Sequence, residues 1–508
     1  MIKIKCQNER YTYDMYHIVK SFFPDAEINQ TVDNEQESLV QIEVDRDSCF
    51  CCGACDKDMR QEEQFEVKSS ETDQITDKRE KKRYLNKKLY KWLVSITGEI
   101  HAWGDMTGVR PTKMIMEKLE ENLTDDEIVR FMEDTYVVGE KKSRLGIEIA
   151  KREKEQLEKL DYENGYSLYI GIPFCPTTCS YCSFTSYPIA KWEKRTDEYV
   201  DALLKELSGI AELSQGKKLN TIYMGGGTPT TLSARQMDRV LTHLEENFCF
   251  DDLKEFTIEA GRPDSITREK LEVIYRHGVG RISINPQTMQ QRTLDTIGRH
   301  HTVEDIVRVY HMARKIGFDN INMDLIAGLP GEHPEDMADT LRQIKELAPD
   351  SLTVHALAMK HGSRLTREKA ARKQNEDQSE GDLMSNKQMA LELEEMIDMA
   401  SRCAEEMGLK PYYLYRQKNI AGNFENVGYA KVDKAGIYNI LIMEEKQSII
   451  AAGAGATTKV VLPYEIPAPG SKNGRMTNLI RIENVRDVGE YISRIYEMIE
   501  RKGEWLWR

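Results

Sequence analysis

Three cysteines close together in the sequence are the residues best suited to chemistry. Cys175, Cys179 and Cys182 follow a C-x3-C-x2-C spacing. A [4Fe–4S] cluster takes four thiolates, one for each iron, so three thiolates leave one iron open to chelate and activate a small molecule. The alternative is three free thiols or a zinc site. Zinc sites usually pair two C-x2-C units, or one unit with two histidines, and no Cys or His follows Cys182 before His243. The spacing therefore favours an iron–sulfur cluster.

A glycine run and several polar residues form a second set of candidates. In Met224-Gly-Gly-Gly-Thr-Pro-Thr230 the consecutive glycines let backbone amides approach a ligand, although a plain tight turn has the same composition. Glu259, Gln287 and Asp324 each stand at the end of a predicted strand, where a single polar residue is ordinary loop chemistry. Three such residues at the same end of successive parallel strands are predicted to surround the opening of one binding site. Carboxylates in that ring suit a zwitterionic, cationic ligand, and Arg299 is the candidate partner for the ligand's own carboxylate.

Alternating strands and helices must position these residues. The sequence predicts strands at 168–172, 221–224, 255–259, 281–285, 320–325 and 351–355. Helices are predicted between them, at 197–213, 234–246, 268–277, 303–316 and 334–347. Six strand–helix repeats are typical of parallel βα units with right-handed connections. Six units are two short of a closed eight-stranded barrel, so the predicted α/β fold is an open, partial (βα)6 barrel with a lateral mouth for a bulky substrate.

Length and composition divide the chain further. At 508 residues it is too long for one compact core. We expect an N-terminal α+β accessory domain at 1–160, the barrel at 161–361, a charged linker at 362–386 and a C-terminal α/β domain at 387–508. Within the last of these, helices are expected at 389–407 and 487–502.

Charge and hydropathy restrict the class of protein. A net charge of −14 argues against nucleic acid as the main partner, because phosphate binding needs a basic face. No apolar run approaches the length of a membrane span, and residues 1–6 lack the apolar stretch of a signal peptide, so the cytoplasm is the expected location. Ten cysteines in such a chain indicate metal or redox use rather than disulfides.

The residues also carry a family resemblance. The cysteine spacing, with Tyr181 before the third cysteine, resembles the signature of the radical S-adenosylmethionine (SAM) superfamily. Within it the chain is similar to the oxygen-independent coproporphyrinogen dehydrogenase group. The matched pieces are Leu-Tyr169-Ile-Gly-Ile-Pro-Phe-Cys175, the glycine run, Glu259, Gln287, Arg299 and Asp324-Leu-Ile-x-Gly-Leu-Pro330. The whole chain resembles the HemZ-type branch of this group, including the run from Trp103 to Lys113 and the segment 411–429.

This resemblance implies cofactors, site residues and a reaction. The three cysteines would hold a [4Fe–4S] cluster, and SAM would chelate its open iron. Residues implied in SAM binding are Tyr169, Phe184, Gly226, Gly227, Thr228, Glu259, Gln287, Arg299, Asp324 and Ala358. The implied enzyme is an oxidoreductase of haem biosynthesis that converts two propionates of coproporphyrinogen III to vinyl groups, giving protoporphyrinogen IX. It would draw electrons from a donor such as flavodoxin or ferredoxin.

Two departures from the group's pattern leave other activities open. Phe184 lies two residues after the third cysteine, where the best-known dehydrogenases have a fourth Cys and the haem-chaperone branch has Phe. Gly171 stands where those dehydrogenases usually place His. One alternative is therefore a haem-binding chaperone that keeps the cluster but does not decarboxylate. Another is a different radical SAM enzyme acting on tetrapyrroles, such as a haem-opening methyltransferase.

The segment 412–418 is a candidate for substrate contact. A tetrapyrrole needs flat aromatic or apolar contacts and cations for its propionates. Tyr412, Tyr413, Tyr415, Arg416 and Lys418 supply both types, although an aromatic strand packed on the barrel would have the same composition.

A second group of cysteines lies near the N-terminus, in Cys49-Phe-Cys51-Cys52-Gly-Ala-Cys55. Four thiols could bind an auxiliary cluster or zinc, but so tight a loop is poorly suited to four tetrahedral positions. Spare thiols are the favoured interpretation.

Overall fold

The computed structural model describes residues 1–24, 26–45, 62–358, 364, 367, 386–417, 423–469 and 476–507. The N-terminal cysteine group 49–55, Lys418 and nearly all of the predicted linker lie outside these residues, so the predictions made for them remain predictions.

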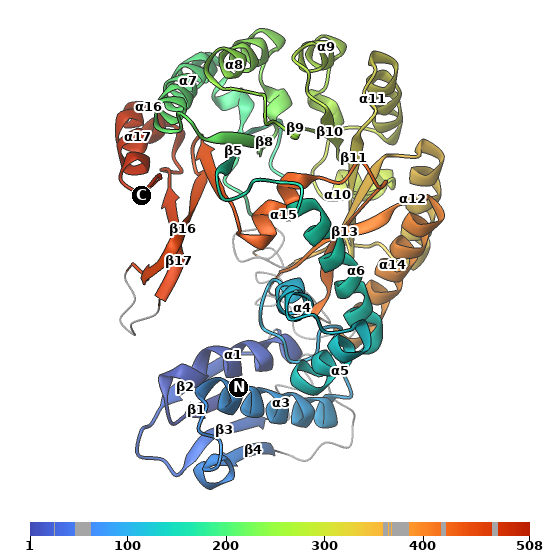
Figure 1. Ribbon diagram of the computed structural model, residues 1–508. Coiled ribbons are helices and arrows are strands. Elements are labelled where there is room, and N and C mark those ends of the chain that lie inside the picture. The colour runs from blue at the N-terminus through green and yellow to red at the C-terminus, as the bar shows by residue number, and fades with distance from the viewer. Residues whose placement is uncertain are drawn as a thin grey trace.

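An open sheet of parallel strands forms the centre of the molecule (Figure 1). The six predicted strands are all present, as β5 (Gly165–Ile172), β8 (Lys218–Gly226), β9 (Glu255–Gly261), β10 (Arg281–Ile284), β11 (Ile321–Ala327) and β12 (Ser351–Ala356). They lie side by side in the order β5-β8-β9-β10-β11-β12, and every neighbouring pair is parallel. The predicted open α/β barrel is confirmed.

A seventh parallel strand, β15 (Ser448–Ala452), pairs with the free edge of β5. The strand is short, and sequence periodicity did not predict this return to the sheet. Antiparallel pairs extend both edges. They are β13 (Lys410–Arg416) with β14 (Glu425–Ala430) beside β12, and β16 (Thr457–Pro467) with β17 (Met476–Glu483) beside β15. The sheet therefore has eleven strands among the described residues and does not close.

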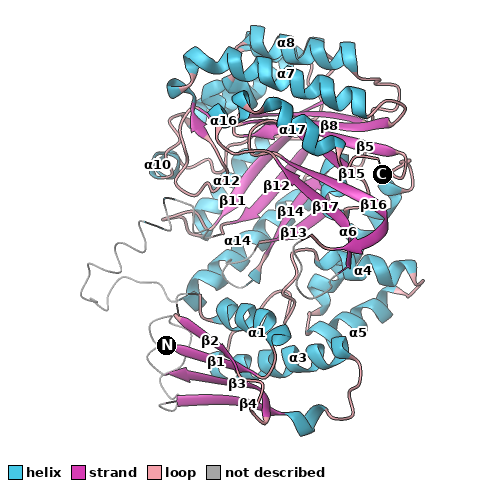
Figure 2. Cartoon of the chain, turned by 90° about the vertical axis from the view of Figure 1, so that its left-hand side faces the viewer, coloured by secondary structure: helices cyan, strands magenta, loops and turns pink. Residues whose placement is uncertain are grey.

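Helices cover the outer face of the sheet, and α15 (Ile437–Glu444) packs on the strands from the concave side (Figures 1 and 2). The outer helices are α7 (Thr196–Leu213), α8 (Ala234–Asn247), α9 (Arg268–Arg276), α11 (Val303–Ile316), α12 (Pro334–Leu347) and α14 (Asn386–Glu406), with α10 (Gln291–Thr296) in a connection. Each buries an apolar stripe against the strands, as expected for amphipathic helices. Ser233 and Thr302 start α8 and α11 with capping boxes, which satisfy the first free amides of each helix.

The N-terminal part has a small sheet and core of its own. The sheet has the order β2-β1-β3-β4, formed by β1 (Ile2–Cys6), β2 (Ile28–Val32), β3 (Ser38–Asp45) and β4 (Glu62–Lys68). Helices α1 (Glu9–Phe22) and α3 (Lys78–Thr97) pack on it, and the resulting core runs from Ile2 to Leu93. By contrast α4 (Pro111–Glu120), α5 (Asp125–Tyr136) and α6 (Glu140–Leu157) contribute side chains to the core of the central sheet. The two cores therefore meet between Leu93 and Trp103, and the domain boundary expected at residue 160 stays a prediction.

The remaining elements are short. They are β6 (Phe174–Cys175), β7 (Tyr187–Pro188), α15 (Ile437–Glu444), α16 (Val488–Ser493), α17 (Ile495–Gly503) and the 3-10 turns η1 (Ser69–Thr72), η2 (Ile189–Lys191), η3 (Glu193–Arg195), η4 (Pro229–Thr231) and η5 (Pro263–Ser265). The helix predicted at 487–502 is divided at Arg494, whose φ of −110° and ψ of 24° leave the helical region. Among the described residues no helix combines the length and apolarity that crossing a bilayer requires.

A buried ionic network joins the C-terminal helices to the central sheet. Lys502 in α17 and Glu206 in α7 form an ion pair with an Nζ–Oε1 distance of 2.6 Å, and both side chains are 0% exposed. Asn484 donates to Glu206 Oε1 over 2.8 Å and accepts from Lys502 Nζ over 2.7 Å. The other carboxylate oxygen of Glu206 accepts from the Gly453 amide, 2.8 Å away, and from the Tyr491 hydroxyl. One network therefore fixes both α17 and the loop that follows β15.

Candidate functional site

A cavity of about 400 Å³ opens on the concave face, toward the carboxyl ends of the parallel strands. Most of the predicted site residues line it together. These are Cys175, Cys179, Cys182, Phe184, Gly226, Gly227, Thr228, Glu259, Gln287, Arg299, Asp324, Ala358, Tyr413 and Tyr415. Tyr169 lines an adjoining cavity, and Arg416 lies elsewhere. The central prediction, that residues on successive strands surround one mouth, agrees with this geometry.

The loop that carries the three cysteines is fixed by hydrogen bonds to neighbouring loops. The Ser180 amide donates to the Ile297 carbonyl over 3.0 Å, and the Thr177 hydroxyl donates to the Gly298 carbonyl over 3.0 Å. The Thr228 hydroxyl lies 3.5 Å from Cys175 Sγ as a donor. Burial raises the pKa of the Cys175 thiol, and the Thr228 hydrogen bond opposes that rise.

Arg262 was not singled out from the sequence, yet it is a central residue of the site. Its guanidinium is 3% exposed, lies 3.8 Å from Cys179 Sγ and donates to the Thr177 carbonyl over 2.9 Å. The charge of Arg262 opposes the rise that burial causes in the pKa of the Cys175 thiol, and Arg262 itself is paired with Asp264 over 2.6 Å. Arg262 follows Glu259 by three residues on a loop, a position with no periodicity that could have predicted the contact.

The glycine run is required by close backbone packing against the strand before the cysteines. A Cβ atom on Gly227 would lie 2.5 Å from the Phe174 carbonyl oxygen, and Gly226 has a φ of +106°. The Gly227 amide donates to the Ile172 carbonyl over 2.7 Å, which leads the chain directly to Thr228 beside Cys175. The glycines therefore also position the cysteine loop.

The two carboxylates in the cavity have opposite pKa shifts. Burial raises the pKa of Glu259 to about 7, and the charge of Asp324 adds to the shift. The pKa of Asp324 is lowered, although its burial acts in the opposite direction. A hydrogen bond and charge from His355 lower it, and so does a hydrogen bond that the side-chain amide of Asn322 donates over 2.7 Å. Both strands run further than predicted, to Gly261 and Ala327, so these carboxylates stand on the concave face just before the strand ends.

Gln287 is held in an uncommon backbone conformation. Its φ is +68°, in the left-handed region, although it is not glycine. Its amide donates to the Asp324 carbonyl and its carbonyl accepts from the Ile326 amide, each over 2.9 Å. Strain of this kind concentrates at functional sites, where the surrounding structure fixes it.

Unsatisfied polar atoms in the wall of the cavity indicate a polar ligand. The Nε atoms of Arg281 and Arg299 and the Oδ1 atom of Asn285 are buried and have no hydrogen-bond partner among the described residues. Leaving such atoms unpaired is unfavourable, so native proteins satisfy them with a ligand or water. Three thiols line this cavity, together with carboxylates and guanidinium groups, and this set of side chains suits an iron–sulfur cluster and a zwitterionic cationic ligand.

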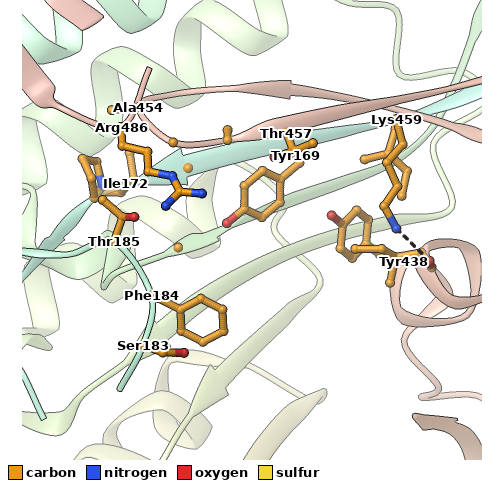
Figure 3. Close-up of a pocket in the computed structure, with 17 residues that line it drawn as sticks. Tyr169, Ile172, Ser183, Phe184, Thr185, Tyr438, Ala454, Thr457, Lys459 and Arg486 are labelled. Carbon is orange, nitrogen blue, oxygen red and sulfur yellow. Dashed lines mark hydrogen bonds between the residues drawn. The ribbon is translucent and has the colours of Figure 1, made fainter. Parts of the chain in front are cut away.

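A second cavity, of about 440 Å³, adjoins the first and shares Ser183, Phe184, Gly226 and Ile442 with it (Figure 3). Tyr169 stands in its wall, in a stack of three rings with Tyr223 and Tyr438. The loop after β15 contributes Ala454, Gly455 and Ala456 to the wall of this cavity. Gly453 in this loop has a φ of +107°, and a Cβ atom there would lie 2.2 Å from the Gly171 carbonyl oxygen.

The tyrosines and the arginine of the segment 412–418 separate onto two faces of β13. Tyr413 and Tyr415 point into the first cavity, with their rings nearly parallel at 11° and their centroids 6.3 Å apart. Strand alternation turns Tyr412 and Arg416 the other way. Arg416 is 4% exposed and donates to the Met106 carbonyl over 2.8 Å, so the predicted substrate contact does not fit its position.

Comparisons with known proteins agree with these features. The sequence pattern of the Radical SAM superfamily matches residues 169–344. The chain is 39% identical over 414 residues to the oxygen-independent coproporphyrinogen-III oxidase-like protein HemZ of Bacillus subtilis, covering 81% of this chain and 78% of that protein. It is 36% identical over 192 residues to the heme chaperone HemW of the same organism, covering 38% of this chain and 50% of that protein.

Among solved structures, the coproporphyrinogen III oxidase HemN from Escherichia coli has a similar fold. The TM-score is 0.51 at 24% sequence identity, covering 68% of this chain and 73% of that chain. The chain therefore belongs to the radical SAM superfamily, whose cofactors are a [4Fe–4S] cluster and SAM, and within it to the HemZ-type branch of the coproporphyrinogen oxidase-like proteins.

Proposed function

We propose that this protein is a radical SAM oxidoreductase that decarboxylates two propionates of coproporphyrinogen III to vinyl groups, giving protoporphyrinogen IX without oxygen. The observation that carries the proposal is the single cavity that collects the three cysteines, the glycine run and the polar residues of successive strands. Similarity to HemZ over most of both chains supports the choice of a tetrapyrrole substrate. The electron donor would be a small redox protein such as flavodoxin or ferredoxin.

The residues of the cavity have distinct proposed tasks. Cys175, Cys179 and Cys182 would hold the cluster, which with SAM supplies a carbon-centred radical able to remove a hydrogen atom from the substrate. Asp324, charged at neutral pH, would face the cationic part of SAM, while Arg299 would face its carboxylate. The walls would exclude water, which protects a radical from side reactions.

Tyr413 and Tyr415 are the proposed contacts for the flat face of the substrate. Both line the cavity, and the Tyr415 hydroxyl is 3.2 Å from His355 Nδ1, which fixes the ring at the mouth. Parallel aromatic rings give apolar contact to a planar ligand without requiring a charge. No side chain is needed as a general base on the substrate. The hydrogen would leave as an atom taken by the SAM-derived radical, the carboxylate would leave as carbon dioxide, and the one electron released would pass to a separate one-electron acceptor.

The direct test is anaerobic turnover. The protein would be reconstituted with iron and sulfide, then incubated with SAM, a reductant and coproporphyrinogen III, and the tetrapyrrole followed by mass spectrometry. Stepwise loss of two carboxyl groups with 5′-deoxyadenosine formed alongside is the expected result. An unchanged porphyrinogen with an intact cluster would contradict the proposal.

A haem chaperone of the same group is the second candidate, and Phe184 is the observation that favours it. Phe184 occupies the position where the haem-chaperone branch has Phe, and its side chain is 69% exposed between the two cavities. An exposed ring beside a cavity is available to a flat apolar ligand. Stoichiometric haem binding without decarboxylation, and without SAM turnover, would select this function. A methylated, ring-opened product from haem would instead identify a methyltransferase.

Glu259 lines the same cavity as Asp324 and would also face the cationic part of SAM, so SAM binding is expected to depend on pH. Because its pKa is raised to about 7, the side chain loses its proton only near neutrality, and only then can it attract a cation. We expect SAM affinity to be fully developed above pH 7 and to fall as the pH drops through 6. In the absence of SAM, the stability of the fold depends on pH in the opposite direction. The folded state keeps a proton on Glu259 that the unfolded state releases between about pH 4.5 and 7, so the free energy of unfolding falls as the pH rises through this range.

Calorimetry of SAM binding to the reconstituted protein between about pH 5.5 and 8 measures this dependence. Glu259→Gln is the matched control, because it keeps the size of the side chain and removes its titration. It should bind SAM more weakly at pH 8 and lose the pH step. An equal step in both proteins would show that another group titrates.

A further inference from the structure

A third cavity, of about 500 Å³, lies in the N-terminal part of the protein and shares no lining residue with the two cavities at the cysteines. Its walls come from α3, from the loop before α4 and from the first turn of α4. Asp14 of α1 and Tyr136 at the end of α5 complete them. This loop belongs to the Trp103–Lys113 segment, which has no task in the reaction proposed above.

The face of α3 that borders this cavity is cationic. Arg79, Lys82, Arg83 and Asn86 stand at helical spacing i, i+3, i+4 and i+7, so they share one face. The apolar residues of the same helix, among them Leu85 and Leu89, are buried in the N-terminal core.

The opposite wall adds two more cations, Arg110 and Lys113. The carboxylates in the lining are Asp14 and Asp105, so cations are in excess although the protein as a whole has a net charge of −14. A concentration of positive charge inside a concave surface attracts anions.

Two of these cations are already neutralised, which identifies the ones left for a ligand. Lys82 pairs with Asp14 over 2.8 Å, and Arg110 pairs with Glu445 over 2.8 Å. Arg83 lies over the Tyr136 ring, 5.8 Å from its centroid. Within the described ranges, Arg79, Arg83 and Lys113 have no ion pair.

The loop wall is held rigidly by the central sheet. Arg416 donates to the Met106 and Gly108 carbonyls, over 2.8 and 3.2 Å, and its own amide donates to the Val109 carbonyl over 2.8 Å. At the start of the segment, Trp103 Nε1 donates to Glu425 over 2.8 Å. Pre-ordered walls bind a ligand with a smaller entropic cost.

Polar groups without partners face the same place. Asp105 is 4% exposed, and its Oδ1 atom has no hydrogen-bond partner in the part of the chain that the structure describes. Burial raises the pKa of Asp105 to about 7, so its carboxyl group can carry a proton and donate to an anion near neutral pH.

We propose that this cavity binds a small polyanion, whose carboxylate or phosphate groups are held by Arg79, Arg83 and Lys113. Met106, Val109 and Met114 in the lining would contact an apolar or flat part of the same molecule. Carboxylates could come from a tetrapyrrole and phosphates from a nucleotide. Both are recognised by the same guanidinium and ammonium donors.

Binding to the reconstituted full-length protein tests the proposal, with ATP, inorganic pyrophosphate and coproporphyrin III as separate calorimetric probes. We expect at least one probe to bind and its affinity to fall about tenfold or more in Lys113→Gln and in the double variant Arg79→Gln/Arg83→Gln, because each change removes charge-assisted hydrogen bonds. ATP or pyrophosphate as the probe that binds would indicate a phosphate ligand, and coproporphyrin a polycarboxylate.

Lys91→Gln is the matched control, because Lys91 lies on the same helix, is exposed and does not line the cavity. It should leave the affinity unchanged, and thermal unfolding should be alike in all variants. The proposal is overturned if no probe binds, if the cavity variants bind as tightly as the wild type, or if Lys91→Gln weakens binding equally through general charge.

Discussion

Cys179→Ala is expected to remove the visible absorption of the cluster and to reduce SAM cleavage to background. Cys179 is 8% exposed, lines the central cavity and lies 3.8 Å from an Arg262 nitrogen. Loss of a residue that only supports a metal ligand typically costs about 10–100-fold in affinity or activity, so loss of a ligand itself should cost more. Iron and sulfide content, absorption and 5′-deoxyadenosine formation measure the effect.

Two further variants provide reference values for this loss of cluster and of SAM cleavage. Arg262→Gln should retain the three thiols and fall within the intermediate range of about 10–100-fold, because it removes a neighbouring cation and not a ligand. Cys249→Ala should behave as wild type, since Cys249 is exposed and lies outside the cavity. A Cys179→Ala protein that keeps its cluster and cleaves SAM at the wild-type rate would refute the assignment of the cluster site.

Lys502→Met should lower the free energy of unfolding by about 3–5 kcal/mol, the usual effect of removing one partner of a buried ion pair. Lys502 and Glu206 are both 0% exposed, so Glu206 would keep a buried charge without its cation. Asn484 and the Gly453 amide would remain as donors, but neither carries a charge. Urea unfolding followed by tryptophan fluorescence measures the change.

Two comparisons separate the buried charge from other effects of the substitution. The double variant Glu206→Leu/Lys502→Met should recover part of the loss, because it leaves no unpaired charge. Lys345→Met breaks an ion pair with Glu406 whose side chains are 50% and 62% exposed, and should cost less than about 1 kcal/mol. Equal effects of Lys345→Met and Lys502→Met would contradict the argument from burial.

The parts of the fold that the sequence predicted are those with local patterns. Each βα unit places its strand and helix within a short window, and the apolar periodicity of that window is sufficient to locate both. The return of β15 to the edge of β5 has no such signal, because the pairing joins residues far apart in the chain. The same applies to Arg262, whose contact with Cys179 depends on how two loops meet in space.

The position of Arg416, by contrast, could have been predicted from the sequence. Within a strand, alternate residues face opposite sides, so Tyr413 and Tyr415 could be separated from Arg416 as soon as 410–416 was recognised as a strand. Composition alone grouped the aromatic and basic residues together. Alternation within the strand, rather than composition, would have placed Arg416 on the face opposite the two tyrosines.

The place of β15 in the chain also has a consequence for synthesis on the ribosome. At roughly 5–20 residues per second, the 275 residues between the end of β5 and the start of β15 take on the order of tens of seconds to translate. Throughout that interval the outer edge of β5 has no partner strand, and an unpaired edge is a template for incorrect pairing with other chains. The nascent chain therefore needs this edge protected, for example by a chaperone, until β15 has emerged and paired with β5.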